Sequence, residues 1–369
     1  MADPRDRRHP AGALILFLLA ACGGGDGTGP VIPPPPPPPP PPPAPSPRLI
    51  FTSPIAGVPM QTVFYGAYRD HGSRDYECGF KWYGGHQGVD ILLRNFRAQD
   101  SGVAVIAAAP GTVILVRDGQ PDRNTVNGSG GFGNHVLVEH QPGGAFAYYA
   151  HLRNGSIRVA ANDPVKRGDT LGLVGSSGNS NWPHLHFEVS DQGQVVDPFV
   201  GNCNPVTSPP TWQAQLPWQG EFAVLDAGIT RPPVNFATLL ERPADADTIS
   251  PTDNVVVFWA NLLNVQASST RVVLQSAGGT GLGLVSTGTF TTYSTRFLVA
   301  SFSLTGMLTT EGEYAIVLYV TPIGQLEREV ARRTFTFDPA ATPGPERAPG
   351  RGPAASHSIW LSPDAGERP

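Results

Sequence analysis

The sequence predicts an all-β protein with two successive β-rich regions, residues 48–219 and 220–339. In the first region, short runs of β-branched and aromatic residues alternate with glycine-rich turns, and almost no stretch has the period of a helix. In the second region, apolar runs recur between loops, and RFLVASFSL (296–304) has apolar residues at every second position on one face. This alternation is typical of a sheet with its other face in water, so we expect a β-sandwich of immunoglobulin-like type here.

Candidate strands follow one another along both regions and are separated by turn signals such as NGSGGFGN and GSSGNSNWP. In the first region we expect strands at residues 103–107, 112–117, 136–140, 146–151, 170–174 and 184–189. In the second region we expect them at residues 255–260, 271–275, 296–304, 314–320 and 333–337. The last segment, residues 340–369, is rich in Pro, Gly, Ala and Arg, and we expect it to be a disordered tail.

The N-terminus has the features of an export signal. Arginines precede the apolar run AGALILFLLAAC (11–22), which is too short to span a bilayer as a mature helix. Its end, LAAC, resembles the bacterial lipobox, which implies removal of residues 1–21 and attachment of lipid to Cys22. The alternative is an ordinary signal peptide with Cys22 incidental. The lipobox resemblance predicts a membrane anchor through Cys22, on an outer-membrane lipoprotein that faces the periplasm or is exported to the surface.

A linker, residues 22–47, follows the signal and contains a run of 11 prolines at 33–43. Such a run forms a stiff polyproline II rod of ~3.1 Å per residue, so it can hold a domain on the order of 30 Å from its anchor. We interpret it as a spacer, although a ligand for a proline-binding module has the same composition. The formal net charge is −5 at pH 7, and no stripe of Lys and Arg predicts a nucleic-acid partner.

Cys78 and Cys203 form an even pair in an exported, oxidising setting, and we predict a disulfide between them. The bond would close a loop of 125 residues, which corresponds to about 4 to 5 kcal/mol in the chain-entropy model. The competing interpretation, a pair of metal ligands, has little support because neither cysteine has a CxxC partner.

Two segments place polar side chains on one side of an extended backbone. In GGHQGVDI, the glycines disfavour a helix, and the even spacing lets His86 and Asp90 leave the same side of a strand, with Gly88 allowing a bend between them. In PHLHFEV, His184 and His186 share one face with Glu188, while the alternate residues are apolar.

A third segment, YYAHL, ends another β-rich run with His151, which by parity shares a face with Tyr149. A histidine pair on one strand is more often a hydrogen-bonded surface feature than a metal site. Together, however, the three segments offer four histidines and one carboxylate, and nitrogen and oxygen ligands of this kind suit Zn²⁺. A catalytic zinc keeps three protein ligands and an open position, so two groups remain for proton transfer and oxyanion stabilisation.

The order of these motifs across residues 85–200 resembles the M23 or lysostaphin-type metallopeptidases, also called LytM-domain proteins. The matching segments are HxGxD, AAAPGTV, GFGNHVLVEH, YAHL, VKRGDTLGLVGSSGNS, HLHFEV and VDP. This resemblance implies a barrel-sandwich-hybrid β fold, one Zn²⁺ per chain, and cleavage of peptide bonds in cell-wall peptidoglycan. It makes His86, Asp90 and His186 the zinc ligands, and it gives catalytic roles to His151 and His184.

The sequence departs from the family pattern at Trp182, where relatives have a small residue before the proline, and this change bears on substrate preference. Glu188 is either an acceptor that orients a ligand imidazole or a solvated strand residue. Two other functions stay open: a non-enzymatic activator of a wall amidase, whose relatives have generally lost ligand or catalytic residues, and a secreted peptidase that attacks glycine-rich proteins. The second β region has no role that the resemblance assigns.

Overall fold

The structure is a computed structural model, and the residues it describes belong to one compact unit, residues 47–369. The described residues are 49–57, 62–65, 74–79, 81–82, 85–124, 131–205, 210–215, 217, 222–263, 268–286, 296–341 and 357–361. The predicted signal peptide, the lipidation site Cys22 and the proline run lie outside them. Among the described residues, no helix combines the length and apolar character that crossing a bilayer requires.

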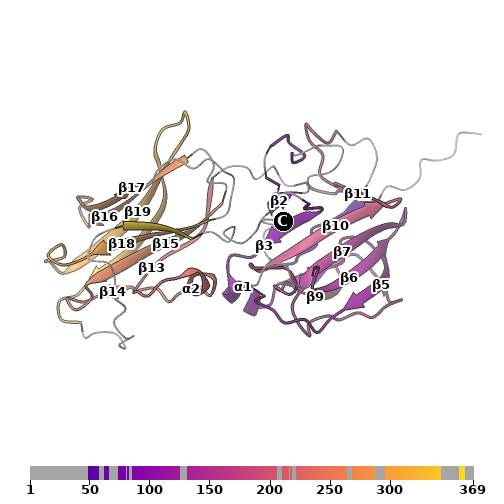
Figure 1. Cartoon of the computed structure of the whole chain (residues 1–369), viewed down its shortest axis with the longest axis horizontal. Coiled ribbons are helices and arrows are strands. Elements are labelled where there is room, and N and C mark those ends of the chain that lie inside the picture. The colour runs from indigo at the N-terminus through magenta and orange to yellow at the C-terminus, as the bar shows by residue number, and fades with distance from the viewer. Residues whose placement is uncertain are drawn as a thin grey trace, which may run out of the picture. The chain divides into compact units, whose positions relative to one another are not determined.

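The N-terminal lobe, defined here as the described residues of 49–217, contains an eight-stranded sheet in the order β2-β3-β10-β7-β6-β5-β8, with β11 paired to β10 (Figure 1). Two small sheets, β1-β12 and β4-β9, complete the lobe. The bounds of the strands are β1 Ile50–Phe51, β2 Thr62–Tyr65, β3 Val89–Leu92, β4 Ala104–Ile106, β5 Gly111–Arg117, β6 Asn134–His140, β7 Ala145–Leu152, β8 Pro164–Val165, β9 Thr170–Leu173, β10 His184–Asp191, β11 Gln194–Val196 and β12 Thr211–Trp212.

The core of this lobe lies against the apolar face of β10 and β7. Phe187 pairs in register with Tyr149, and their rings are in edge contact at 5.1 Å between centroids. Phe51 of β1 packs edge-on against Phe187 at 5.5 Å, and all three side chains are buried. The alternation seen in PHLHFEV therefore has its expected physical cause, since every second residue of β10 enters this core.

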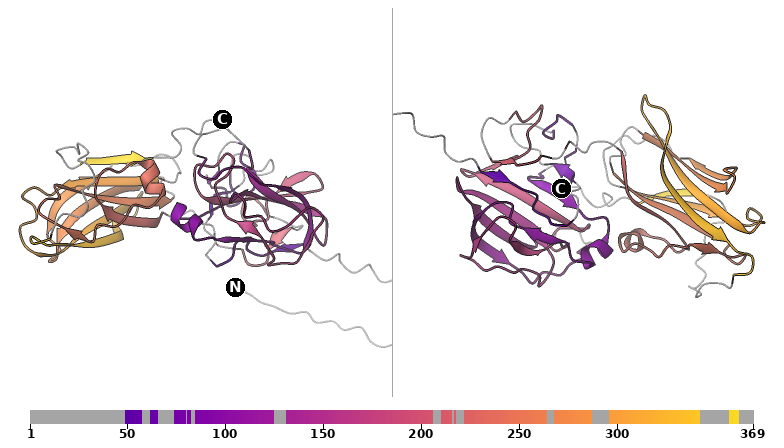
Figure 2. Two further views of the ribbon diagram at one scale, coloured as in Figure 1. Left: turned by 90° about the horizontal axis from the view of Figure 1, so that it is seen from below. Right: turned by 180° about the vertical axis from the view of Figure 1, so that it is seen from behind.

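The C-terminal lobe, defined as the described residues of 222–361, has two sheets, β13-β15-β18-β21 and β14-β20-β19-β16-β17 (Figure 2). One apolar cluster holds side chains of both, including Phe258 and Phe302 from the first sheet and Ile316 and Leu318 from the second. Its strands are β13 Ala223–Thr230, β14 Thr248–Ile249, β15 Val255–Leu263, β16 Ser268–Ser276, β17 Gly281–Ser286, β18 Arg296–Ser303, β19 Gly312–Pro322, β20 Arg328–Phe337 and β21 His357–Leu361. An immunoglobulin-like topology for this lobe stays a prediction.

The predicted all-β class is confirmed, and every candidate strand range overlaps an observed strand. Two short helices, α1 (Phe96–Asp100) and α2 (Phe236–Leu240), are each capped by an asparagine whose side chain accepts a hydrogen bond from the first turn, Asn95 and Asn235 respectively. The disulfide between Cys78 and Cys203 is present, as the pairing of cysteines predicted.

The structure differs from the sequence expectation in two places. Residues 357–361, which fall in the predicted disordered tail, form β21 and pair with β18 in antiparallel register. The open edge of β18 offers unpaired backbone groups, and a short segment that can adopt an extended conformation satisfies them. In β18 itself, Phe297 and Val299 are buried on the face that alternation had left for water, so this sheet is covered on both sides.

Candidate metal centre

Three neighbouring strands position the polar side chains that the sequence singled out. In the sheet β3 pairs with β10 and β10 pairs with β7, all antiparallel, and His186 is in register with both Asp90 and Ala150. Directly paired residues share a face of a sheet. Asp90 and His186 therefore meet on one face, and the small Ala150 beside them leaves room for the imidazole.

His86 enters the same site from the turn that precedes β3. Gly88 makes this turn feasible, because its φ is +94° and a Cβ there would lie 2.7 Å from the carbonyl oxygen of Phe187 and 2.9 Å from the Cα of Glu188. Glycine alone tolerates both the backbone conformation and so close an approach to β10. The glycine of HxGxD is thus the residue that brings the turn against the neighbouring strand.

The ligand atoms of three residues form a small triangle. His86 Nε2 is 3.1 Å from Asp90 Oδ1, His186 Nδ1 is 2.9 Å from the same oxygen, and the two nitrogens are 3.3 Å apart. All three residues are buried. Tetrahedral zinc with bonds near 2.0–2.1 Å requires ligand atoms about 3.3 Å apart. The donor set and its spacing therefore fit one zinc ion.

The electrostatics of the triangle also favour a cation. Burial by itself raises the pKa of Asp90. The neighbouring His86 and His184 and the hydrogen bonds to Asp90 lower this pKa by more than burial raises it. The pKa therefore lies well below its usual value, and the carboxylate is charged. For His186, burial lowers the pKa, but Asp90 and Glu188 more than compensate and raise it to about 9. Positive charge is thus stabilised at this position.

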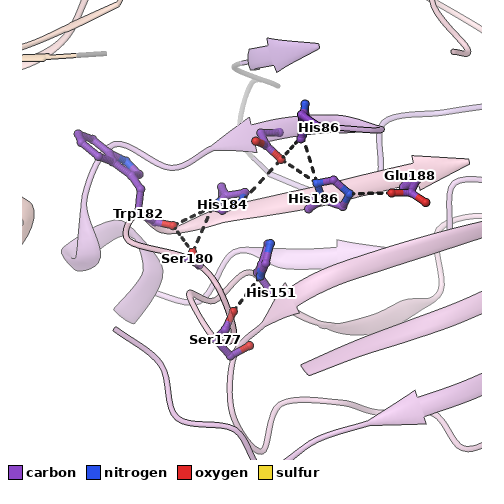
Figure 3. A network of polar contacts seen from close by, with 9 residues as sticks. His86, His151, Ser177, Ser180, Trp182, His184, His186 and Glu188 are labelled. Atoms are coloured by element: carbon purple, nitrogen blue, oxygen red, sulfur yellow. Dashed lines mark hydrogen bonds and ion pairs between the residues drawn. The ribbon is translucent and has the colours of Figure 1, made fainter. Parts of the chain in front are cut away.

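Glu188 contacts His186, the third residue of the triangle. Its Oε2 lies 3.3 Å from His186 Nε2, the nitrogen that faces away from the triangle, and its side chain is 13% exposed. A carboxylate accepts only, so His186 donates Nε2–H to Glu188, which leaves Nδ1 as the nitrogen that would bind a metal in the triangle. Of the two interpretations of Glu188, the structure supports the orienting acceptor (Figure 3).

His151 reaches this site by breaking strand alternation. Parity predicted a face shared with Tyr149, but Tyr149 packs in the core whereas the ring of His151 lies 4.6 Å from that of His184. The reason is a φ of +59° at His151, a left-handed conformation that costs about 1–3 kcal/mol for a residue other than glycine. Its backbone N–H donates to Phe132 O at 2.9 Å, which helps hold this conformation.

Both histidines next to the triangle are oriented by backbone carbonyls. His151 Nδ1 lies 2.8 Å from Ser177 O, and His184 Nδ1 lies 2.8 Å from Trp182 O (Figure 3). Because a carbonyl only accepts, each imidazole donates Nδ1–H and keeps a lone pair on Nε2. His184 Nε2 is 3.6 Å from Asp90 Oδ1, which places it beside the triangle.

The protonation of these two groups follows from their surroundings. Burial, reinforced by the positive charge that His184 and His186 can carry, holds the pKa of His151 well below its usual value. Burial likewise lowers the pKa of His184, against the attraction of Asp90. Both imidazoles are therefore neutral near pH 7 and can accept a proton at Nε2.

Sequence reasoning missed an aromatic group next to His186. The ring of Phe132 lies 5.4 Å from that of His186, and Tyr148 lies 4.8 Å from Phe132. Tyr148 is in register with Glu188, and it therefore shares the face of the site. The available signal was parity, since Tyr148 alternates with the core residue Tyr149.

His140, the last residue of β6, is buried in the core. Its Nε2 is 2.9 Å from the hydroxyl oxygen of Tyr149, and its Nδ1 is 3.2 Å from Pro110 O. Because the Pro110 carbonyl only accepts, neutral His140 carries its proton on Nδ1 and accepts at Nε2 from the Tyr149 hydroxyl, which in turn accepts from the N–H of Ala108. His140 therefore contributes to the core.

Known proteins resemble the part of the sequence that holds this site. Residues 84–198 match the model described as Peptidase family M23. The DD-carboxypeptidase/endopeptidase Mpg of Neisseria meningitidis serogroup B is 36% identical over 114 residues, which are 31% of this chain and 22% of Mpg. The murein hydrolase activator NlpD of Escherichia coli is 33% identical over 116 residues, which are 31% of this chain and 26% of NlpD.

Among solved structures, the catalytic domain of the prophage-encoded M23 protein EnpA from Enterococcus faecalis is 28% identical, with a TM-score of 0.27, and covers 38% of this chain and 90% of that chain. The chain spans only about a quarter of the length of the curated relatives it matches. Residues 84–198, which hold the triangle of ligand atoms and both neighbouring histidines, are therefore a Peptidase family M23 domain.

Proposed function

We propose that this chain is a zinc-dependent endopeptidase that hydrolyses peptide cross-links of bacterial peptidoglycan. The observation that carries the proposal is the buried triangle of His86, Asp90 and His186 with two neutral imidazoles beside it. The M23 match and the names of the relatives, an endopeptidase and a murein hydrolase activator, support peptidoglycan as the substrate class.

In this proposal, His86, Asp90 and His186 hold one zinc ion. When bound, zinc supplies a Lewis acid that polarises the scissile carbonyl and lowers the pKa of a water molecule to around 7. His151 and His184 are the catalytic residues. Each presents Nε2 as a proton acceptor, and the imidazole that takes the proton of the attacking water becomes a donor to the leaving amine. The other stabilises the charge that develops on the carbonyl oxygen.

The proposed organisation of the chain serves a substrate that lies away from the membrane. Residues 1–21 are the signal, Cys22 carries the lipid, and the linker 22–47 spans the distance to the wall. The peptidase domain comprises 48–219, and the sandwich comprises 220–339. The location is then the cell envelope, as an outer-membrane lipoprotein that faces the periplasm or the surface.

The test uses the mature chain purified with zinc and presented with peptidoglycan sacculi. We expect soluble muropeptides whose mass spectra identify the bond that is cut, loss of release with a chelator, and recovery with added zinc. His184→Ala should abolish release while one zinc per chain remains, whereas His186→Ala should lose the metal. Full activity of His184→Ala would refute the assigned roles.

The likeness to NlpD favours one second candidate, an activator of a separate wall amidase. The two functions differ in what the chain does alone. An endopeptidase releases peptide-cleaved fragments without other proteins, whereas an activator releases nothing until an amidase is added and then yields fragments cut at the glycan–peptide bond. All five positions that the resemblance assigns to zinc binding and catalysis are filled here, which favours the enzyme.

A further inference from the structure

The 175–183 loop, GSSGNSNWP, supplies the backbone carbonyls that orient both histidines beside the triangle. Ser177 O accepts from His151 Nδ1, and Trp182 O accepts from His184 Nδ1. The directions of the two imidazoles therefore depend on what holds this loop in place.

The C-terminal lobe holds one end of the loop through Trp182. The indole is only 4% exposed and stacks on Phe297 of β18, with 5.2 Å between ring centroids and 19° between planes. Phe236 of α2 lies edge-on at 6.5 Å. The indole Nε1–H donates to Leu93 O at 2.9 Å, which ties the same residue to the end of β3, the strand of Asp90.

The stack of Trp182 on Phe297 explains two features that the sequence patterns did not predict. Trp182 replaces a small residue of the family pattern, and because it is buried it takes no part in a substrate-binding wall. Phe297 and Val299 are apolar on the face of β18 that alternation had left for water, and both belong to the apolar cluster that contains Trp182. Exposure of Phe297 and Val299 to water would be unfavourable, and packing against Trp182 buries these apolar side chains together.

A second set of contacts holds the other end of the loop. The backbone N–H of Arg123 donates to Ser176 Oγ at 2.8 Å, while its guanidinium contacts Glu241 at 2.7 Å and Asp100 at 2.8 Å and lies over the ring of Phe96 at 4.7 Å. Exposed ion pairs contribute little stability, but this one fixes the direction of Arg123 between the loop and the end of α2.

We propose that the C-terminal lobe is a positioning element of the site: through the stack of Phe297 on Trp182 it fixes the 175–183 loop, and through the Trp182 carbonyl it fixes the direction of His184. Trp182 and Phe297 are then positioning residues that touch no substrate. This inference rests on the proposed function, since it assigns the lobe a part in the same site.

The test compares two phenylalanines of β18 that face opposite sides of the strand, in the full mature chain with zinc bound. Phe297 contacts Trp182, whereas Phe302 is buried in the core of the C-terminal lobe itself. Each is changed to Leu and to Ala, and every variant is assayed well below its own unfolding midpoint. The Leu variants keep most of the apolar volume, so activity and the His184 signal can be measured in them even if Phe297→Ala fails to fold.

Two readouts are needed. The first is kcat and KM on a soluble cross-linked muropeptide, where we expect Phe297→Ala to lower kcat about tenfold or more at unchanged KM, with partial recovery in Phe297→Leu. The second is the imidazole ¹H–¹⁵N NMR signal of His184, assigned with His184→Gln. It should shift in the Phe297 variants and stay constant in the Phe302 variants.

Identical His184 signals in Phe297→Ala and the wild type would overturn the proposal, as would equal effects of Phe302→Ala. If the wild-type chain cuts no muropeptide, the endopeptidase function fails, but the NMR comparison still decides whether the lobe positions His184. The two failures are therefore distinguishable.

Discussion

Replacing Gly88 with Ala separates the steric role of this glycine from its conformational freedom. The new Cβ would lie 2.7 Å from Phe187 O and 2.9 Å from the Cα and Cβ of Glu188, at a φ of +94°. The left-handed backbone costs about 1–2 kcal/mol for a residue with a Cβ, and overpacking against β10 adds about 1–3 kcal/mol. We expect a destabilisation of about 2–5 kcal/mol.

Gly85 provides the matched control, because its φ is +80° but nothing lies within 4 Å of a Cβ there. Gly85→Ala should therefore lose only about 1–2 kcal/mol and keep its zinc affinity. In Gly88→Ala, relief of the contact moves the turn with His86 away from His186, and the zinc affinity should fall about tenfold or more, as when an orienting partner of a ligand is lost.

The assays are urea unfolding of the zinc-free chains and competition for zinc with a chromophoric chelator. Gly88→Ala should lose more stability than Gly85→Ala, and only Gly88→Ala should bind zinc more weakly. Equal stability losses and equal zinc affinities in the two variants would refute this prediction, because they would show that β10 accommodates the added methyl group.

The remaining predictions concern a ligand partner, the disulfide and a buried histidine. Glu188→Gln removes the charged acceptor of His186 Nε2–H and should weaken zinc binding about 10–100-fold in the same chelator competition. Replacing both Cys78 and Cys203 with Ser opens a loop of 125 residues and should lower the free energy of unfolding by up to about 4–5 kcal/mol in urea titrations. Burial lowers the pKa of His140 from 6.5 to about 4, so the unfolded chain binds the extra proton between these values. The contribution of His140 to the free energy of unfolding is therefore complete above pH 6.5. It falls by about 3 kcal/mol as the pH is lowered towards 4, which urea titrations across that range should show.

Each of these predictions has its own control. Glu139→Gln, on β6, should leave zinc binding unchanged, and an equal loss there would show that charge in general, not the contact to His186, matters. Reduction of the wild-type chain should reproduce the stability of the double serine variant. For His140, replacement by Gln should flatten the acid dependence relative to the wild type, and an unchanged slope would assign that dependence to other groups.

Much of the site could be predicted from the sequence because strand parity is a local property. The even spacings of His86 and Asp90, and of His184 and His186, placed each pair on one side of an extended backbone, and the register of β3 with β10 brings the pairs together. Parity failed at His151, because a single left-handed residue at the end of β7 turns its side chain to the other face. Periodicity carries no information about such a residue.

The sequence by itself determined the all-β class, most strands, the cysteine pair and the five side chains of the candidate site. These depend on alternation, turn residues and residue chemistry, all of which are local along the chain. Only the tertiary structure decided which nitrogen of each imidazole faces the triangle, because that choice depends on acceptors such as Ser177 O and Trp182 O in a distant loop. It also decided that Trp182 stacks on Phe297, since that contact joins residues more than a hundred positions apart and neither segment's periodicity encodes its partner.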